Sequence, residues 1–142
     1  MIICTIIIPL FNSEDCISNL FKTLDSFINN KKYEIIFIDD YSIDKTEDLV
    51  NSKLRKKKIS NLKFIKNNKN YGPAYSRNIA LSIAIGKFVA FLDSDDSWHS
   101  NKMQTQIETM LEENILFSGT NHIILNSRNI FPKNLPFKKY KV

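Results

Sequence analysis

Three carboxylates, Asp93, Asp95 and Asp96, directly follow a short apolar run over residues 87–92. The run lies between Gly86 and these acids, which is typical of a buried strand. In an extended segment Asp93 and Asp95 point the same way, and open α/β sheets bind ligands beyond the carboxyl ends of their strands. Two neighbouring carboxylates repel each other unless a positive charge lies between them. We therefore expect a hard divalent cation with oxygen ligands at this position.

Polar side chains also follow two other apolar runs. Asp39 and Asp40 end the run over residues 33–38, and Phe11 and Asn12 follow the first run of the chain. An isolated Asp-x-Asp is weak support for a metal site, because such acids also cap helices or lie in solvated turns. Since parallel strands end at one edge of a sheet, we expect the three loops to form a single site.

The elements that must position these loops alternate between strand and helix. Continuous apolar runs predict strands over residues 2–8, 33–38, 62–65, 87–92 and 115–125. Apolar residues at helical spacing predict helices over residues 17–28, 44–54, 73–85 and 100–114. This alternation predicts an α/β fold with a Rossmann-like, mostly parallel sheet flanked by helices. We expect one domain over residues 1–142.

Individual residues are expected to set the boundaries of these elements. Pro9 cannot donate to a sheet ladder, so we expect it to end the first strand. Asn12 or Ser13 is the expected cap of the first helix. Gly86 is the expected C-terminal residue of the helix over residues 73–85.

Composition limits the class of protein. The 142 residues carry a net charge of +5 and include only two cysteines. We expect a folded, cytoplasmic protein, because its apolar content suits a globular domain and the cysteines do not form a disulfide pattern. No apolar run has the roughly 18 residues needed to span a bilayer. The basic residues leave peripheral contact with the cytoplasmic membrane face open, and we expect no nucleic-acid partner.

Four segments, in order and at similar spacing, resemble the nucleotide-sugar-binding half of the family 2 glycosyltransferases. They are residues 6–12 (IIIPLFN), 37–46 (FIDDYSIDKT), 70–78 (NYGPAYSRN) and 91–98 (FLDSDDSW). The resemblance covers nearly the whole chain and implies the GT-A fold. It implies the donor half of such an enzyme, either truncated or completed by a segment absent from this sequence.

The resemblance implies how a nucleotide base would bind. Pro9, Phe11 and Asn12 would form a wall of the base and ribose site. Asp40 would accept a hydrogen bond from a uracil-like imide N–H, for which a carboxylate is a suitable acceptor. Phe11 stands where the family often has Tyr, so a stacking face is kept and a hydroxyl is lost.

The same resemblance implies how the diphosphate would bind. Asp93 and Ser94 would contact the substrate, Asp93 beside the ribose. Asp95, together with Asp93 and with some contribution from Asp96, would hold Mn²⁺ or Mg²⁺. Arg77 would add a guanidinium to the phosphates, although its helical position equally suits an ion pair.

Two departures from the family pattern concern the second loop and the acceptor. Tyr41 stands where the family usually has Gly, which puts the tightness of that turn in doubt. The catalytic base is unknown, because no segment matches the acceptor-binding half that carries it in the family. Glu108, Glu112 and Glu113 lie on the helix after the metal motif, which is the wrong place for that role.

The leading hypothesis is a metal-dependent, inverting glycosyltransferase that moves a sugar from a UDP-sugar donor to a glycan or lipid-linked acceptor. The alternative is a non-catalytic fragment that binds nucleotide sugar and metal without turnover. Residues 93–97 also match the nucleophile motif of haloacid dehalogenase phosphatases, but that class carries the motif on an early strand. A receiver domain is disfavoured because no late Lys follows a strand.

Overall fold

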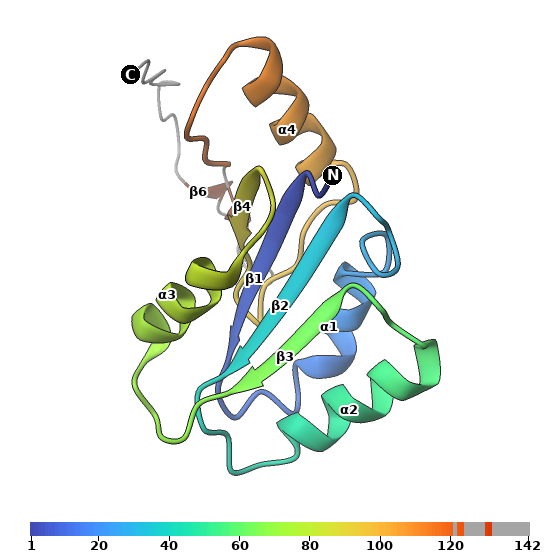
Figure 1. Cartoon of the computed structure of the whole chain (residues 1–142), viewed down its shortest axis with the longest axis vertical. Coiled ribbons are helices and arrows are strands. Elements are labelled where there is room, and N and C mark those ends of the chain that lie inside the picture. The colour runs from blue at the N-terminus through green and yellow to red at the C-terminus, as the bar shows by residue number, and fades with distance from the viewer. Residues whose placement is uncertain (121, 124–129, 132–142) are drawn as a thin grey trace. The chain divides into compact units, whose positions relative to one another are not determined.

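Four parallel strands form the central sheet, in the order β3-β2-β1-β4 (Figure 1). Their bounds are β1 Cys4–Leu10, β2 Tyr33–Asp39, β3 Leu62–Lys66 and β4 Phe88–Phe91. The two central strands, β1 and β2, are almost entirely buried, as their continuous β-branched sequences predict. The predicted parallel sheet is therefore confirmed, and each of these strands lies within two residues of its expected bounds.

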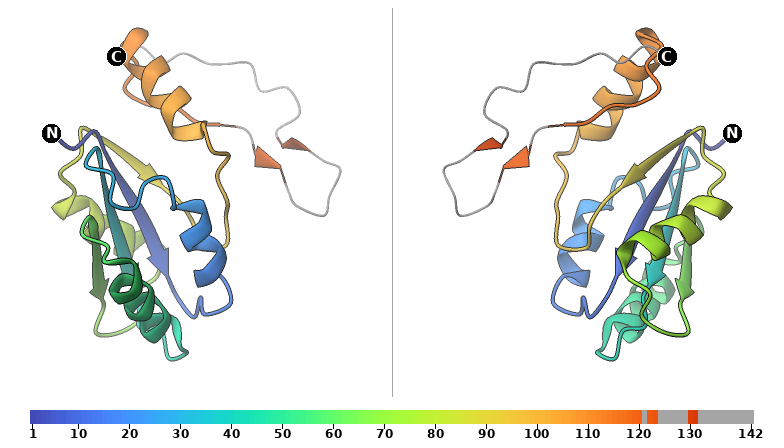
Figure 2. Two further views of the ribbon diagram at one scale, coloured as in Figure 1. Left: turned by 90° about the vertical axis from the view of Figure 1, so that its right-hand side faces the viewer. Right: turned by 90° about the vertical axis from the view of Figure 1, so that its left-hand side faces the viewer.

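Three helices connect these strands and cover both faces of the sheet. They are α1 Ile17–Thr23, α2 Thr46–Lys57 and α3 Pro73–Ile83. Figure 2 shows α1 and α2 on one face of the sheet and α3 on the other. On the α3 side, Ala80 packs against Ile7, Ile36 and Ile38 in a cluster of buried side chains. This packing sets the position of α3 relative to β1 and β2.

The chain divides into two compact units, Met1–Trp98 and His99–Val142. The structure describes residues 1–120, 122–123 and 130–131. Within the second unit, α4 spans Lys102–Glu112, and β5 His122–Ile123 pairs antiparallel with β6 Ile130–Phe131. The single domain expected over residues 1–142 stays a prediction.

The strand expected over residues 115–125 is wrong for residues 115–120, which form no strand. Of the rest, only His122–Ile123 is a strand, and residues 121 and 124–125 lie outside the described part of the chain. Leu116 and Phe117 are 70% and 77% exposed. The apolar residues here predict a strand, but these two side chains lie in solvent outside any strand.

The first helix is shorter than its apolar spacing predicts. Helix α1 ends at Thr23, and the chain continues in turns, with the Phe27 N–H donating to the Leu24 carbonyl at 2.9 Å. Leu24 and Phe27 remain buried in these turns. A three-residue spacing of apolar side chains therefore suits both a helix and successive turns. Neither Asn12 nor Ser13 caps α1, whose N-cap is Cys16.

Pro9 does not end β1, which continues to Leu10. The β1–β4 ladder extends only as far as the pair Ile7↔Phe91, so Pro9 lies where β1 is paired on the β2 side alone. A sheet tolerates proline where one side of the strand is unpaired. Strand β1 thereby carries Pro9 and Leu10 to the edge where the polar loops gather.

The buried carboxylate of Glu34 lies at the opposite end of the strands from the polar loops. It accepts hydrogen bonds from the Thr5 hydroxyl at 2.7 Å and the Ile85 N–H at 3.0 Å, and it pairs with Lys63 at 2.7 Å. Burial raises the pKa of Glu34, but the contacts with Lys63, Thr5 and Ile85 lower it more, so the net shift is downward. The charged carboxylate thus joins the start of β4 to β1 and β2.

Gly86 has a packing role in place of the expected helix-ending one. Helix α3 already ends at Ile83, and the Gly86 N–H donates to the Thr5 hydroxyl at 2.9 Å. A Cβ on Gly86 would lie 2.4 Å from the Thr5 backbone nitrogen and 2.8 Å from the Phe88 carbonyl oxygen. The glycine is needed because backbone atoms approach it closely on entry to β4.

We predict that Gly86→Ala lowers the free energy of unfolding by about 2 kcal/mol, because backbone atoms cannot move aside as a flexible side chain would. Urea unfolding followed by circular dichroism measures the change. Gly119→Ala is the matched control, since nothing lies within 4 Å of its added Cβ, and we expect little loss there. Equal stability of the Gly86→Ala protein and the wild type would contradict the packing role.

Candidate donor-binding site

A pocket of about 340 Å³ lies at the carboxyl ends of β1, β2 and β4, beside the first turns of α3. Its lining residues are Pro9, Leu10, Phe11, Asp40, Asn70, Pro73, Arg77, Asp93, Ser94 and Asp95. The structure therefore brings together the expected site residues of all three loops, apart from Asn12 and Asp96. Leu10, Asn70 and Pro73 were not among the expected site residues, although all three lie in the segments that carry the resemblance.

The loop after β1 is tied to the two neighbouring loops by side-chain hydrogen bonds. The Asn12 N–H donates to the Ser42 hydroxyl at 2.9 Å, and the Asn12 amide oxygen accepts the Ile43 N–H at 3.0 Å. The hydroxyl groups of Ser13 and Ser94 lie 3.1 Å apart. Asn12 thus joins the first loop to the second and does not line the pocket. Ser13 joins the first loop to the loop after β4, a connection that sequence reasoning missed.

Asp40 is a buried carboxylate that holds the segment before α3. It accepts hydrogen bonds from the Asn67 amide at 2.7 Å, the Tyr71 N–H at 3.0 Å and the Gly72 N–H at 2.7 Å. Burial raises the pKa of Asp40, but hydrogen bonds from Tyr71, Asn67, Gly72 and Ser76 lower it more, and the net shift is downward. These donors occupy about as many acceptor positions as a carboxylate has.

The turn that carries Asp40 is held by its neighbour, Asp39. The carboxylate of Asp39 is fully buried and accepts hydrogen bonds from both the backbone N–H and the hydroxyl of Ser42. Between them Tyr41 has φ +69°, in the left-handed region that glycine adopts without strain. Tyr41 therefore adopts the left-handed conformation that a glycine at this position would adopt without strain.

We predict that Tyr41→Gly raises the free energy of unfolding by about 0.5 kcal/mol, because relief of the left-handed strain slightly exceeds the backbone entropy cost of glycine. Thermal and urea unfolding measure the change. Ile43→Gly is the matched control: Ile43 is also an exposed apolar residue of this loop, and its φ is not positive. We expect that control to lose about 0.5 to 1 kcal/mol, and a similar loss in Tyr41→Gly would contradict the strain argument.

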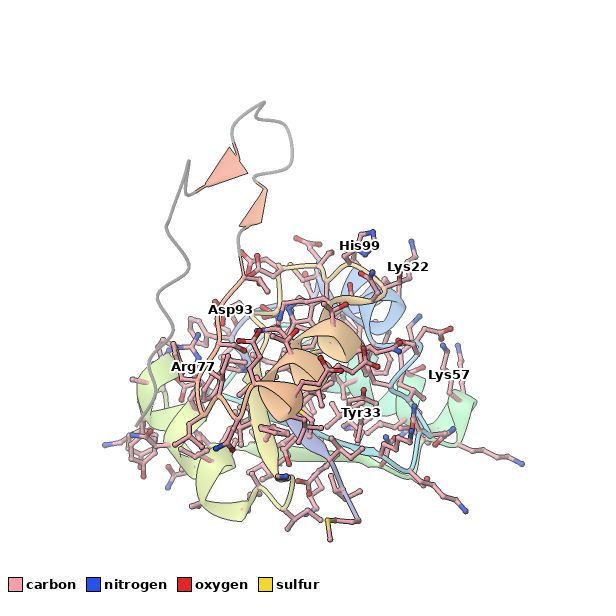
Figure 3. All side chains as sticks on the ribbon, turned by 90° about the horizontal axis from the view of Figure 1, so that it is seen from above. Lys22, Tyr33, Lys57, Arg77, Asp93 and His99 are labelled. Carbon is pink, nitrogen blue, oxygen red and sulfur yellow. The ribbon has the colours of Figure 1, made fainter. Side chains whose placement is uncertain are left out.

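Asp93, Asp95 and Arg77 place opposite charges in the pocket. The Arg77 guanidinium Nη2 lies 2.5 Å from Asp93 Oδ1, and Figure 3 shows the two labelled side chains on the same side of the molecule. Asp95 also lines the pocket and is exposed. Burial raises the pKa of the nearby Cys16 thiol, and the negative charges of Asp95 and Asp15 raise it further. Asp96 is not among the lining residues.

The donor set of the pocket fits a divalent cation shared with a phosphate ligand. Among the described residues, no group of three or more His, Cys, Asp or Glu side chains is arranged to hold a metal by itself. Mg²⁺ is usually held by one or two carboxylates together with substrate phosphates, and keeps several waters. Asp93 and Asp95 supply two such carboxylates at one pocket.

The model of the family described as Glycosyl transferase family 2 matches residues 5–141. The chain belongs to glycosyl transferase family 2. This family 2 chain is 42% identical over 126 residues to the UDP-Glc:alpha-D-GlcNAc-diphosphoundecaprenol beta-1,3-glucosyltransferase WfaP of Escherichia coli. The match covers 87% of this chain and 47% of WfaP, so the chain spans about half the length of that relative.

Solved structures show the same fold. TarS 1-349 of S. aureus in complex with UDP-GlcNAc superimposes with a TM-score of 0.69 at 34% identity, over 80% of this chain and 32% of that chain. Mannosyltransferase PcManGT from Pyrobaculum calidifontis, in complex with GDP-Man and Mn²⁺, gives a TM-score of 0.71 over 79% of this chain and 33% of that chain. Its 20% identity supports the fold alone. The predicted GT-A fold of this family 2 chain is confirmed.

In the part of the chain that the structure describes, no helix has both the length and the apolar character needed to cross a bilayer.

Proposed function

We propose that this protein transfers a sugar from a UDP-sugar to a glycan or lipid-linked acceptor, in a metal-dependent and inverting reaction. The observation that carries the proposal is the pocket where an aromatic side chain, a guanidinium and three carboxylates meet at the carboxyl edge of the sheet. The name of WfaP gives a UDP-Glc donor and a diphosphoundecaprenol-linked acceptor, and TarS binds UDP-GlcNAc. Both support a uridine donor, and WfaP supports a lipid-linked acceptor.

The base is proposed to bind between the first loop and Asp40. Phe11 is 50% exposed at the pocket, so its ring offers a face for stacking, and Pro9 continues that wall. Several donors already surround the Asp40 carboxylate, and a uracil imide N–H would have to share an oxygen with one of them. Asp40 therefore contributes to binding mainly by holding Asn70 and its neighbours at the pocket.

The diphosphate is proposed to bind beside Arg77, Asp93 and Asp95. A guanidinium suits phosphate oxygens because it can donate two parallel hydrogen bonds. Asp93 and Asp95 would hold Mn²⁺ or Mg²⁺, and such a cation neutralises the charge that develops on the departing UDP. Ser94 lies between the two acids and lines the pocket with them.

Calorimetric titration of UDP into the purified chain, with and without Mn²⁺, tests the donor site. We expect binding that requires the cation. Absence of UDP binding to the folded protein, with GDP or dTDP binding in its place, would contradict the uridine assignment, and absence of all three would contradict the site. Incubation with a radiolabelled UDP-sugar and a lipid-diphosphate acceptor then separates transfer from binding without turnover.

We also propose a cytoplasmic location with peripheral contact to the membrane, because a lipid-linked acceptor lies in a bilayer and the chain carries a net charge of +5. Co-sedimentation with phosphatidylglycerol vesicles at low salt measures this contact. Equal sedimentation with neutral phosphatidylcholine vesicles would contradict the electrostatic basis.

A further inference from the structure

The ion pair between Arg77 and Asp93 occupies one of the two carboxylates proposed for the cation. Arg77 extends from α3, one turn after Pro73, and both residues line the pocket. Its Nη2 lies 2.5 Å from Asp93 Oδ1, and the side chains are 31% and 52% exposed. The protein without ligand therefore already has a positive group at Asp93, contributed by its own chain.

Asp95 differs from Asp93 in this respect. Among the described residues, none forms an ion pair with Asp95, although it lines the same pocket. A cation that enters the pocket without nucleotide meets one free carboxylate and one that is already paired. It must separate Arg77 from Asp93 or bind to Asp95 with fewer ligands.

We propose that Arg77 makes cation binding depend on the nucleotide, because it competes with the cation for Asp93 until a diphosphate draws the guanidinium away. This inference rests on the proposed donor site. In the free protein the guanidinium neutralises Asp93 and repels Mn²⁺. When a diphosphate is present, its oxygens offer Arg77 a bidentate partner, and Asp93 becomes available to the cation together with Asp95.

The competition has a thermodynamic consequence. If the diphosphate raises the affinity for Mn²⁺ by some factor, Mn²⁺ raises the affinity for the diphosphate by the same factor. Part of that factor comes from phosphate oxygens that bind the cation directly, and the proposal assigns another part to Arg77. Removing Arg77 should therefore strengthen Mn²⁺ binding in the absence of nucleotide and reduce the coupling.

The test is a titration of Mn²⁺ into wild type and Arg77→Gln, with free Mn²⁺ counted by electron paramagnetic resonance, first without nucleotide and then with saturating UDP. We expect Arg77→Gln to bind Mn²⁺ alone about three- to tenfold more tightly, the range expected from loss of a half-exposed ion pair and a nearby positive charge. With UDP present we expect no gain. The coupling factor between UDP and Mn²⁺ should fall accordingly.

Lys57→Gln is the matched control. Lys57, at the end of α2, pairs with Asp25 at 2.6 Å. Neither residue lines the pocket, and Lys57 lies on the other face of the sheet from α3 (Figure 3). The substitution removes the same charge and a similar ion pair, and we expect Mn²⁺ affinity to stay within twofold of wild type. Thermal unfolding of both variants confirms that they are folded.

Two results would overturn the inference, and they are distinguishable. If Arg77→Gln binds Mn²⁺ alone no more tightly than wild type while UDP and Mn²⁺ still bind together, Arg77 does not compete for Asp93 and the donor site stands. If neither protein binds Mn²⁺ even with UDP, the proposed metal site fails, and the competition fails with it.

Discussion

Asp95→Ala is expected to abolish Mn²⁺-dependent UDP binding, with a loss of at least about 100-fold in affinity and a change in unfolding free energy below about 0.5 kcal/mol. The reason is that Asp95 is exposed at the pocket and supplies one of two carboxylates for the proposed cation. The side chain contributes a ligand to the site and little packing to the fold. Isothermal titration calorimetry with UDP and Mn²⁺ measures the effect.

The matched control for Asp95→Ala is Asp48→Ala. Asp48 is an exposed carboxylate in the first turn of α2 and does not line the pocket. The Asp48→Ala substitution removes the same charge as Asp95→Ala, and we expect it to leave UDP affinity unchanged. Unaltered metal-dependent binding in Asp95→Ala would remove this residue from the metal site.

Asp40→Ala is expected to lower the free energy of unfolding by about 3 to 5 kcal/mol, because it leaves the donors of Asn67, Tyr71 and Gly72 without their acceptor. Urea unfolding measures the loss. Asp25→Ala is the control, since the ion pair of Asp25 with Lys57 is exposed and should contribute less than about 1 kcal/mol. Equal stabilities of the Asp40→Ala and Asp25→Ala proteins would contradict the anchoring role.

The lowered pKa of Asp40 gives this prediction a pH dependence. A carboxyl whose pKa is lower in the folded than in the unfolded protein stabilises the fold above its unfolded pKa, near 3.9. That contribution is lost as the pH falls through the folded pKa. Below about pH 4 the stability of wild type should therefore fall more steeply than that of Asp40→Asn, which has no carboxyl to protonate at this position.

Base recognition by Asp40 can be separated from its structural role. At a temperature where Asp40→Asn is fully folded, UDP affinity should fall more than CDP affinity if the carboxylate contacts the uracil imide, because cytosine carries no hydrogen on N3. An equal loss for both nucleotides would mean that Asp40 acts only by holding the segment before α3. The hydrogen bonds observed at Asp40 already account for that second role.

Much of the fold was predictable because strand and helix signals in this chain are local. Buried parallel strands are continuous apolar runs, and the four such runs before Asp93 became β1 to β4. Residues 115–117 are also apolar, yet residues 115–120 form no strand, and Leu116 and Phe117 are exposed. Burial depends on the neighbours that the tertiary structure supplies.

Residue type and position after a strand are both readable from the chain, so the sequence predicts which loops form the candidate site: Asp40, Asp93 and Asp95 all line one pocket. The pairing of these groups became visible only in the folded structure. Asp40 holds Tyr71 and Gly72, and Asp93 pairs with Arg77 from another element. Such pairings depend on distances between segments far apart in the chain, which spacing along the sequence does not contain.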